Sequence, residues 1–290
     1  MRAYRAWPNG KKVAVSVTVM FETWSDEAAP NYSVQATSLK SGTVDHAAKA
    51  WSTYGGRVGV WRLNRLLKKH GIRGTFFTNG RCAELYPDAV RQLVASGHDL
   101  AAHSYTHDSI LAYMSLDEQR EMIRRSVGLL EDCTGRKVKG WGSPAVAFTP
   151  ETAGFLAQQG LSWTCDITYV DLPIRIRTAY GDIAGVPTTD FSDNRVLKAN
   201  TWDLADVYKG MMNYLRENEP MSMLTMVIHC QFGGRPLVSA VIDEILKYFK
   251  SFDDVWFATH DELAQWALEA KADECTYADR YFNEEARARA

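Results

Sequence analysis

The stretch Asp99-Leu-Ala-Ala-His-Ser-Tyr-Thr-His107 joins a short apolar run to two histidines four positions apart. The apolar run is typical of the end of a buried strand, and a helix starting after Ala102 would place both imidazoles on one face. Neutral imidazole is the commonest metal ligand, and zinc accepts a carboxylate as a further ligand while leaving a position open for water. The spacing indicates a metal site, but one histidine that caps or pairs locally beside an exposed one would give the same pattern.

On both sides of this stretch, short apolar segments alternate with segments of helical spacing. Val13–Phe21 is rich in valine, Leu224–His229 is the most apolar segment, and Ser115-Leu-Asp-Glu118 is a capping box that starts a helix. About eight strand-helix units of this kind predict parallel strands with right-handed crossovers, arranged as a barrel or a doubly wound sheet. Glu22–Tyr54, by contrast, is polar with few periodic positions, which is typical of a functional or interacting loop.

A group of polar residues comes directly after the predicted strands. In a barrel, the carboxyl ends of parallel strands meet at one rim, where catalytic groups collect. We therefore expect one set of side chains to converge there: Glu22, His103, Ser143, Asp166, Thr189, His229 and His260.

The composition is that of an ordinary globular chain. The 290 residues are 46% hydrophobic and 23% charged, enough for one large α/β domain or two modest ones. We expect a single barrel domain over residues 1–270 and a charged tail over 271–290. The formal net charge of −2 gives no indication of a nucleic-acid or membrane-surface partner.

The cysteines and the N-terminal segment bear on the compartment. The five cysteines are odd in number and scattered, which fits reduced thiols better than a disulfide framework. The first apolar run is broken by Ser16 and Thr18 and meets Glu22 rather than a small-residue cleavage site, so it is better explained as a strand than as a signal peptide. We expect a cytoplasmic protein.

Eight short motifs follow one another in a fixed order. They are Val19-Met-Phe-Glu22, Tyr54-Gly-Gly-Arg-Val-Gly-Val-Trp-Arg62, His103-Ser-Tyr-Thr-His107, Gly140-Trp-Gly-Ser-Pro144, Asp166-Ile-Thr-Tyr-Val-Asp-Leu-Pro173, Pro187-Thr-Thr-Asp-Phe-Ser-Asp-Asn-Arg195, Ile228-His-Cys-Gln-Phe-Gly-Gly-Arg-Pro236 and Val255-Trp-Phe-Ala258. In this order the chain resembles the polysaccharide deacetylase (NodB-homology) superfamily, in the branch of the uric-acid-pathway allantoinase, cyclic imidases and a bacterial peptidoglycan deacetylase. The resemblance implies a distorted (β/α) barrel of about seven to eight strands and hydrolysis of a carbon-nitrogen bond, often in a homotetramer.

By this resemblance, the metal ligands would be Glu22, His103 and His107, and a bound water would be the nucleophile. Zinc can lower the pKa of such a water to roughly 7. Glu22 could instead be a strand-end carboxylate that pairs with an arginine or caps a loop.

The chain departs from the family pattern at Met20. Metal-using relatives carry an aspartate two residues before the metal carboxylate as general base, and a thioether cannot take up a proton. The allantoinase branch also lacks this acid and looks metal-independent, yet it lacks the second histidine that is kept here as His107. We interpret Met20 as a packing residue of the pocket wall. At Gly142, where many relatives have an arginine, we expect a wider pocket.

The resemblance also suggests roles around the rim. His229 would stabilise the tetrahedral intermediate or protonate the leaving amine, with Glu22 as the other catalytic residue, although a buried histidine bonded to backbone would look the same. Arg57 and Arg235 could equally be structural ion-pair partners. The predicted substrate-binding residues are Arg57, Tyr105, Trp141, Ser143, Asp166 and Arg235.

Together these features predict a hydrolase of non-peptide carbon-nitrogen bonds that acts on a small amide, imide or ureide. Zinc or another divalent metal would activate the water, and the chain would assemble as a tetramer or dimer. One alternative is a metal-independent hydrolase in which Glu22 and His229 share the proton transfers. Another is a catalytically silent relative that binds a ligand, because the base position is occupied by Met20.

Overall fold

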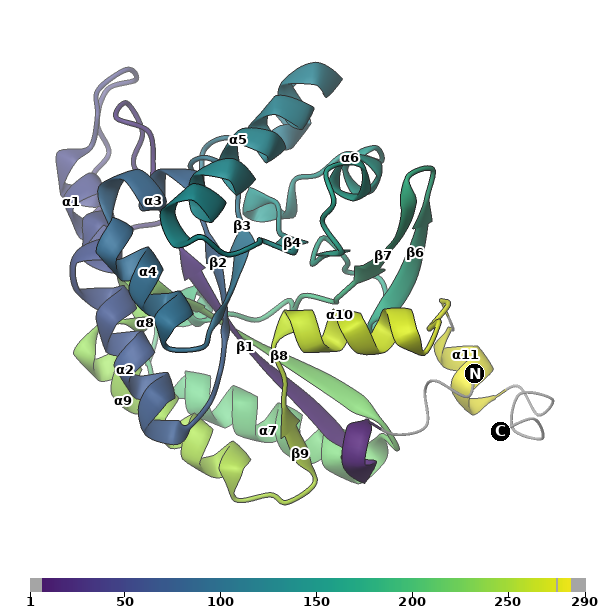
Figure 1. The fold of residues 1–290 in the computed structure, drawn as a ribbon. Coiled ribbons are helices and arrows are strands. Elements are labelled where there is room, and N and C mark those ends of the chain that lie inside the picture. Colours follow the sequence, from purple (N-terminus) through teal and green to yellow (C-terminus); the bar gives the residue numbers. More distant parts are fainter. Residues whose placement is uncertain (1–6, 275, 283–290) are drawn as a thin grey trace.

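The computed structural model describes residues 7–274 and 276–282, which form a curled sheet wrapped by helices on its convex side (Figure 1). The strand order is β6-β7-β5-β4-β3-β2-β1-β8, with β9 also paired to β1, and all pairings except β6 with β7 are parallel. This half-barrel confirms the predicted fold. The strands are β1 Val13–Phe21, β2 Thr75–Thr78, β3 Asp99–Ala102, β4 Gly140–Trp141, β5 Trp163–Thr164, β6 Ile174–Thr178, β7 Gly181–Gly185, β8 Ser222–His229 and β9 Val255–Phe257.

The helices begin and end where local chemistry predicts. Ser115 and Glu118 form the predicted capping box of α5, and Gly135 ends that helix in the left-handed conformation. A π-helical turn, Gly55–Gly59, lies between α1 and α2. The helices are α1 His46–Tyr54, α2 Val60–His70, α3 Gly80–Leu85, α4 Pro87–Ala95, α5 Leu116–Thr134, α6 Thr152–Gln158, α7 Asp203–Asn218, α8 Cys230–Gly233, α9 Pro236–Lys250, α10 His260–Glu269 and α11 Tyr277–Tyr281.

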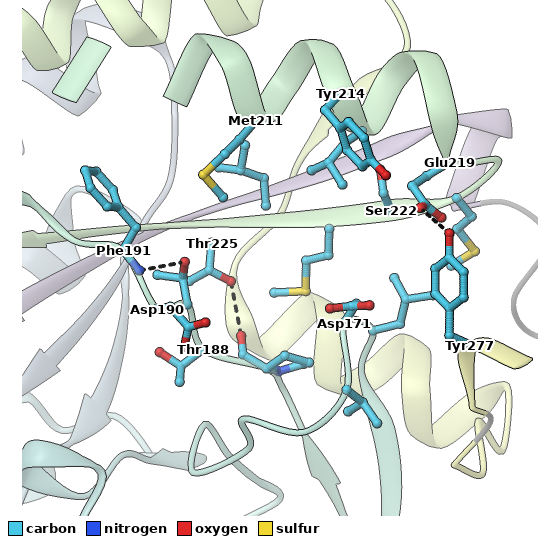
Figure 2. A pocket seen from close by; sticks show the side chains of 18 of the residues that line it. Asp171, Thr188, Asp190, Phe191, Met211, Tyr214, Glu219, Ser222, Thr225 and Tyr277 are labelled. Carbon is cyan, nitrogen blue, oxygen red and sulfur yellow. Dashed lines mark hydrogen bonds between the residues drawn. The ribbon is translucent and has the colours of Figure 1, made fainter. Parts of the chain in front are cut away.

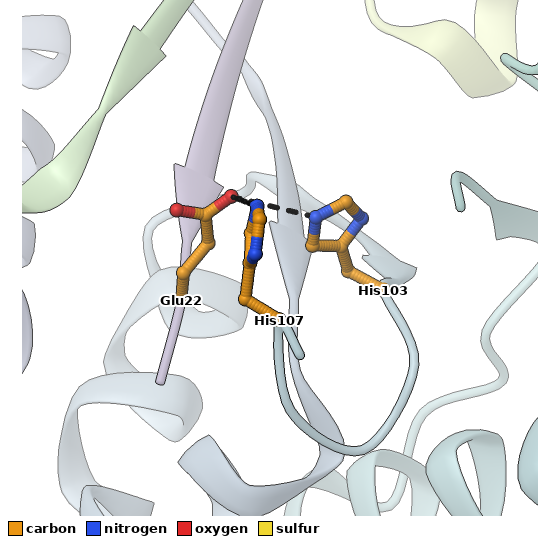
Figure 3. Close-up of side chains that lie close together, drawn as sticks. All are labelled: Glu22, His103 and His107. Atoms are coloured by element: carbon orange, nitrogen blue, oxygen red, sulfur yellow. Dashed lines mark ion pairs between the residues drawn. The ribbon is translucent and has the colours of Figure 1, made fainter. Parts of the chain in front are cut away.

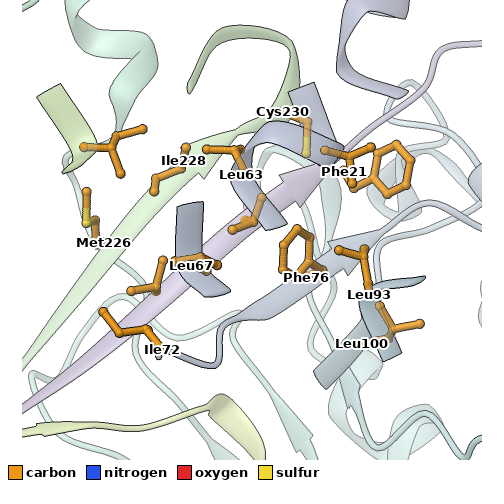
Figure 4. Packing of buried hydrophobic residues seen from close by; sticks show 14 of the residues in the cluster. Phe21, Leu63, Leu67, Ile72, Phe76, Leu93, Leu100, Met226, Ile228 and Cys230 are labelled. Atoms are coloured by element: carbon orange, nitrogen blue, oxygen red, sulfur yellow. The ribbon is translucent and has the colours of Figure 1, made fainter. Parts of the chain in front are cut away.

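β1 separates two layers of the core because its side chains alternate. The valines at 13, 15, 17 and 19 face the helices on the convex side, where Leu63, Leu67 and Phe76 pack against them (Figure 4). Burying each such side chain contributes about 1.5 to 3 kcal/mol. The alternate positions, from Ala14 to Met20, face the concave side, which α10 covers next to β6 and β7. The inside of the half-barrel is therefore more polar than its outside.

The register with which each strand pairs with β1 decides how close its carboxyl end lies to the rim of the half-barrel. β8 pairs along nearly the whole of β1 and brings His229 opposite Met20. β2 pairs with residues 18–21, whereas β9 pairs with residues 13–15. Residues after β2 and β8 therefore reach the rim, and residues after β9 stay much lower.

One local prediction from the sequence is wrong, and two elements were not predicted. The polar segment Glu22–Tyr54 is not all loop, because Asp45 caps α1 by accepting from the Ala48 amide and Trp51 gives the helix a buried side. The short helix α3, Gly80–Leu85, was not predicted from the sequence. Nor was the strand β6, whose alternating Ile-Arg-Ile-Arg pattern pairs antiparallel with β7.

The described part of the predicted tail packs on the barrel. Tyr277 and Tyr281 of α11 both donate to Glu219, and Arg280 donates to the Met221 carbonyl over 3.1 Å. Residues 1–6, 275 and 283–290 lie outside the described residues. Among the helices that are described, none combines the length and the hydropathy needed to cross a bilayer. The four described cysteines, Cys82, Cys133, Cys165 and Cys230, are free thiols.

Candidate metal centre

Glu22, His103 and His107 meet at the rim of the half-barrel (Figure 3). The Oε1 atom of Glu22 lies 3.5 Å from Nε2 of His103 and 3.4 Å from Nε2 of His107. The side chains of Glu22 and His103 are only 2% and 4% exposed, whereas His107 is 21% exposed. The cluster is thus open to solvent mainly along the edge of His107.

A loop, and not the predicted helix, brings the two imidazoles together. After β3 the chain reverses at Ser104, whose φ of 59° is unusual for a residue with a side chain. The His107 amide then donates to the Thr23 carbonyl over 2.8 Å, which fixes this loop to the residue after Glu22. A non-glycine residue with positive φ is often found at functional sites, where the surrounding structure enforces it.

The hydrogen bond of His103 determines its tautomer. Its Nδ1 lies 2.7 Å from the Gly142 carbonyl, which can only accept, so Nδ1 carries the proton. In the neutral form of this tautomer, Nε2 would present a lone pair, as it does in metal-ligating histidines. This Nε2 atom is buried and has no hydrogen-bond partner among the described residues.

The three residues fit a divalent cation. Ligand atoms about 2.0 to 2.2 Å from a tetrahedral zinc ion lie roughly 3 to 3.5 Å apart, which agrees with the two distances from Glu22. All three ligand atoms lie within 4.8 Å of one another. A cation would also satisfy the unpartnered Nε2 atom of His103.

Charge and burial compete in this cluster. Burial by itself would raise the pKa of Glu22, but the imidazoles of His107, His103 and His229 lower it below its ordinary value, so the carboxylate is ionised. Burial lowers the pKa of His107 despite the attraction of Glu22, which favours the neutral ring. An ionised carboxylate and a neutral imidazole, the form favoured at His107, are protonation states that bind a metal.

His229 forms a buried pair with Asp193, a residue that the sequence analysis did not single out. The Nδ1 atom of His229 lies 2.6 Å from Oδ1 of Asp193, and its backbone amide donates to Oδ2 over 2.8 Å. Burial opposes the charged ring, but Asp193 outweighs it and raises the pKa of His229 to about 9. Asp190 and Asp193 look alike in the sequence, and only the fold shows that Asp193 is the buried one.

Three predicted substrate-binding residues form a buried support behind His103. The Trp141 indole donates to the Ser143 hydroxyl over 3.0 Å, and that hydroxyl donates to Asp166 over 2.7 Å. Burial raises the pKa of Asp166 even though Ser143 donates two hydrogen bonds to it. All three are nearly inaccessible to solvent. Their hydrogen bonds hold the chain just after β4, where the Gly142 carbonyl accepts from His103.

Three other predicted substrate-binding residues lie outside the Glu22 cluster, and their role in substrate binding stays a prediction. The Tyr105 hydroxyl donates to Glu84 of α3, and Arg125 of α5 covers its ring at 3.7 Å. Arg57 is exposed on the π-helical turn. Arg235 donates to the Trp51 carbonyl and stacks on Tyr54 at 3.7 Å, which ties α1 to the chain after α8.

Two further expectations about the rim are corrected. The space beside Gly142 is filled rather than widened, because a Cβ there would lie 2.6 Å from Cys165 Sγ and from a carbon of the Phe77 ring. His260 does not reach the rim, because β9 pairs low on β1, and its Nδ1 atom lies 2.9 Å from the Ser16 hydroxyl inside the barrel.

A cavity of about 810 Å³ lies away from this cluster, along the N-terminal half of β8 (Figure 2). Thr189, which was expected at the rim, lines this cavity, together with Asp171, Met211 and Tyr277. The chemistry of the Glu22 cluster, rather than cavity size, identifies the candidate site.

Comparison with known proteins agrees with the half-barrel fold. The family model described as polysaccharide deacetylase matches residues 48–163. A peptidoglycan deacetylase of Helicobacter pylori is 21% identical over 247 residues, which cover 73% of this chain and 84% of that protein. A probable polysaccharide deacetylase of Pseudomonas aeruginosa PAO1 superposes with a TM-score of 0.81 at 27% identity, covering 90% of this chain and 92% of that one.

A Puue allantoinase superposes almost equally well, with a TM-score of 0.80 at 27% identity over 90% of this chain and 91% of that chain. The half-barrel, the matched family model and these relatives lead to one conclusion. The chain carries a polysaccharide deacetylase (NodB-homology) domain, a type of domain found in hydrolases of amide bonds.

Proposed function

We propose that this protein hydrolyses a small amide, imide or ureide with a divalent metal, zinc in our proposal, held by Glu22, His103 and His107. The observation that carries the proposal is the convergence of three metal-binding atoms, one of them the buried Nε2 atom of His103, which makes no hydrogen bond with any described residue. A bound divalent cation would polarise the carbonyl and lower the pKa of a coordinated water to roughly 7.

His229 supplies the acid. Its pKa of about 9 keeps the ring protonated at neutral pH, and because Nδ1 is bonded to Asp193, Nε2 is the nitrogen that can donate to the oxyanion or the leaving nitrogen. Asp193 is a positioning residue that fixes the ring and stabilises its charge.

The segment 23–54, which we call the strap, supports a small substrate. Trp24 stacks on His107 with ring centroids 5.2 Å apart, and Tyr32 lies with its edge toward both Trp24 and Trp51. The side chains of Glu22 and His103 are almost fully covered. A polymer strand would therefore reach them only if the strap moved. A small ring or acyl group could enter beside His107.

The test is turnover of a panel of cyclic imides, ureides, acylated amines and N-acetyl sugars, before and after chelation and with zinc added back. We expect one of the small substrates to be hydrolysed, activity to be lost on chelation and restored by zinc. Hydrolysis of N-acetylated polymer without turnover of any small compound would contradict the proposed substrate class.

Met20 supports a second candidate, a metal-independent hydrolase. The residue faces the concave side opposite His229, so no acid stands where metal-using relatives carry their base. The ionised carboxylate of Glu22 would then accept the proton of the attacking water and His229 would donate to the leaving nitrogen. Full activity after exhaustive chelation would favour this mechanism over the first.

The same Met20 distinguishes an active enzyme from a silent relative. A Met20→Asp variant adds the acid two residues before Glu22, on the same face of β1. Turnover that appears in this variant and is absent from the wild type would identify the wild type as a catalytically silent relative.

A further inference from the structure

The two carboxylate oxygens of Glu22 have different partners. Oε1 faces the imidazoles of His103 and His107, whereas Oε2 accepts a hydrogen bond from Nε2 of Gln231 over 2.8 Å. One oxygen is therefore available to a cation, and the other is held by an amide that follows β8, the strand that pairs with β1 on the side away from β2 and β3.

The amide of Gln231 has one acceptable orientation. An ionised carboxylate only accepts hydrogen bonds, so the NH₂ group must face Glu22, and the same nitrogen lies 3.2 Å from the Tyr32 hydroxyl. In this orientation the buried Oε1 atom of Gln231 receives no hydrogen bond from any described residue. An unpaired buried acceptor costs about 1 to 3 kcal/mol, so the contact with Glu22 is maintained against a local penalty.

The backbone of Gln231 is also fixed. It lies in α8, which the π-helical turn approaches so closely that a Cβ on Gly59 would lie 1.9 Å from the Cys230 carbonyl oxygen. Arg235 donates to the Gln231 carbonyl over 3.2 Å. Since Gln231 itself is fully buried, its side chain has little freedom to leave Glu22.

We propose that Gln231 is a positioning residue that makes Glu22 a one-oxygen ligand, an inference that rests on the proposed metal centre. By holding Oε2, it prevents the carboxylate from gripping a cation through both oxygens. The coordination position that the second oxygen would occupy stays open for water and substrate, as catalytic zinc sites require. Partners of this kind behind a metal ligand commonly alter metal affinity by 10- to 100-fold.

The test is a Gln231→Met variant, which keeps the length of the side chain and removes the donor. We expect its zinc affinity, measured by competition with a chromophoric chelator, to change by about 10- to 100-fold. We also expect the visible absorption of the cobalt-substituted variant to weaken, because a two-oxygen Glu22 raises the coordination number. Gln119→Met is the matched control, since Gln119 is equally buried but bonds to the Met114 carbonyl and Thr149.

The outcomes separate this inference from the proposed function. Zinc binding by the wild type that is lost in His103→Ala establishes the centre, and a wild type without zinc binding overturns the proposed function itself. With the centre established, a Gln231→Met variant with wild-type zinc affinity and cobalt spectrum overturns the role of Gln231.

A crystal structure of the zinc-loaded wild type decides the question if Gln231→Met does not fold. We expect one Glu22 oxygen on zinc and the other bonded to Gln231. Two Glu22 oxygens on zinc, with the amide turned away, would overturn the proposal.

Discussion

His229 and His260 each follow a parallel strand of the same half-barrel, yet their environments are opposite. His229 ends β8 at the rim and is bonded to Asp193, while His260 follows β9 low in the barrel and contacts the Ser16 hydroxyl. Burial lowers the pKa of both rings, but Asp193 outweighs burial at His229 and raises its pKa to about 9. At His260, burial acts alone and lowers the pKa to about 3.

The difference shows that strand register, more than position after a strand, decides which residue can act in catalysis. β8 pairs up to Met20, whereas β9 stops at the level of Val15. A histidine at the rim with a carboxylate is a charged acid at neutral pH. A histidine on the barrel floor without one is a neutral packing group.

The largest effect that we expect is from His229→Gln. Removing the proposed acid should lower kcat by about 10²- to 10⁴-fold, because general acid catalysis contributes that much. Steady-state kinetics on the identified substrate measure it, with circular dichroism as the control for folding. Wild-type kcat in this variant would remove His229 from the reaction.

His260→Ala should affect stability instead. Emptying a fully buried ring position should lower the free energy of unfolding by about 2 to 4 kcal/mol, since the barrel floor cannot fully collapse. Urea unfolding measures the loss, and kcat per folded molecule should stay at the wild-type value. A large fall in kcat without a loss of stability would show that the comparison between the two histidines is wrong.

Asp193→Asn should remove the cause of the raised pKa of His229. Without the carboxylate, burial should pull the pKa of His229 down from about 9, and loss of such a charge commonly shifts a pKa by about 1 to 3 units. The descending limb of the pH-rate profile should move to lower pH by that amount. An unmoved limb would mean that another group controls it.

The comparison also predicts a pH dependence of stability with opposite signs at the two sites. The raised pKa of His229 stabilises the fold fully below about pH 6.5, and this contribution is lost as the pH rises through 9. The lowered pKa of His260 stabilises the fold above pH 6.5, and this contribution is lost as the pH falls toward 3.

Unfolding measured across this range for wild type and both variants checks the signs. The stability lost in His229→Gln should shrink near pH 10, and the stability lost in His260→Ala should shrink near pH 4. The same trend with pH in both variants would contradict the assignment.

Much of the fold could be predicted because local signals agreed with it. The valine alternation of β1, the capping box of α5 and the strand-helix rhythm each depend on residues close together in the chain. The sequence analysis missed β6, whose alternating pattern pairs antiparallel in an otherwise parallel sheet.

The candidate site was partly predictable. The spacing of His103 and His107 was informative even though a loop, not a helix, brings the rings together. Asp193 and the contact between Gln231 and Glu22 depend on tertiary packing between distant segments, which no local pattern encodes. Tyr105 lies outside the cluster because the positive φ at Ser104 turns the loop, and its ring then packs toward α3 and α5.

The most direct test of the account is an equilibrium zinc titration of the purified protein and of His103→Ala. His98→Gln is the control, because His98 is also buried but bonds to the Gly74 amide and Asn64. The account predicts one zinc ion per chain in the wild type and the control, and a loss of tight binding in His103→Ala. Equal zinc binding by His103→Ala and the wild type would contradict it.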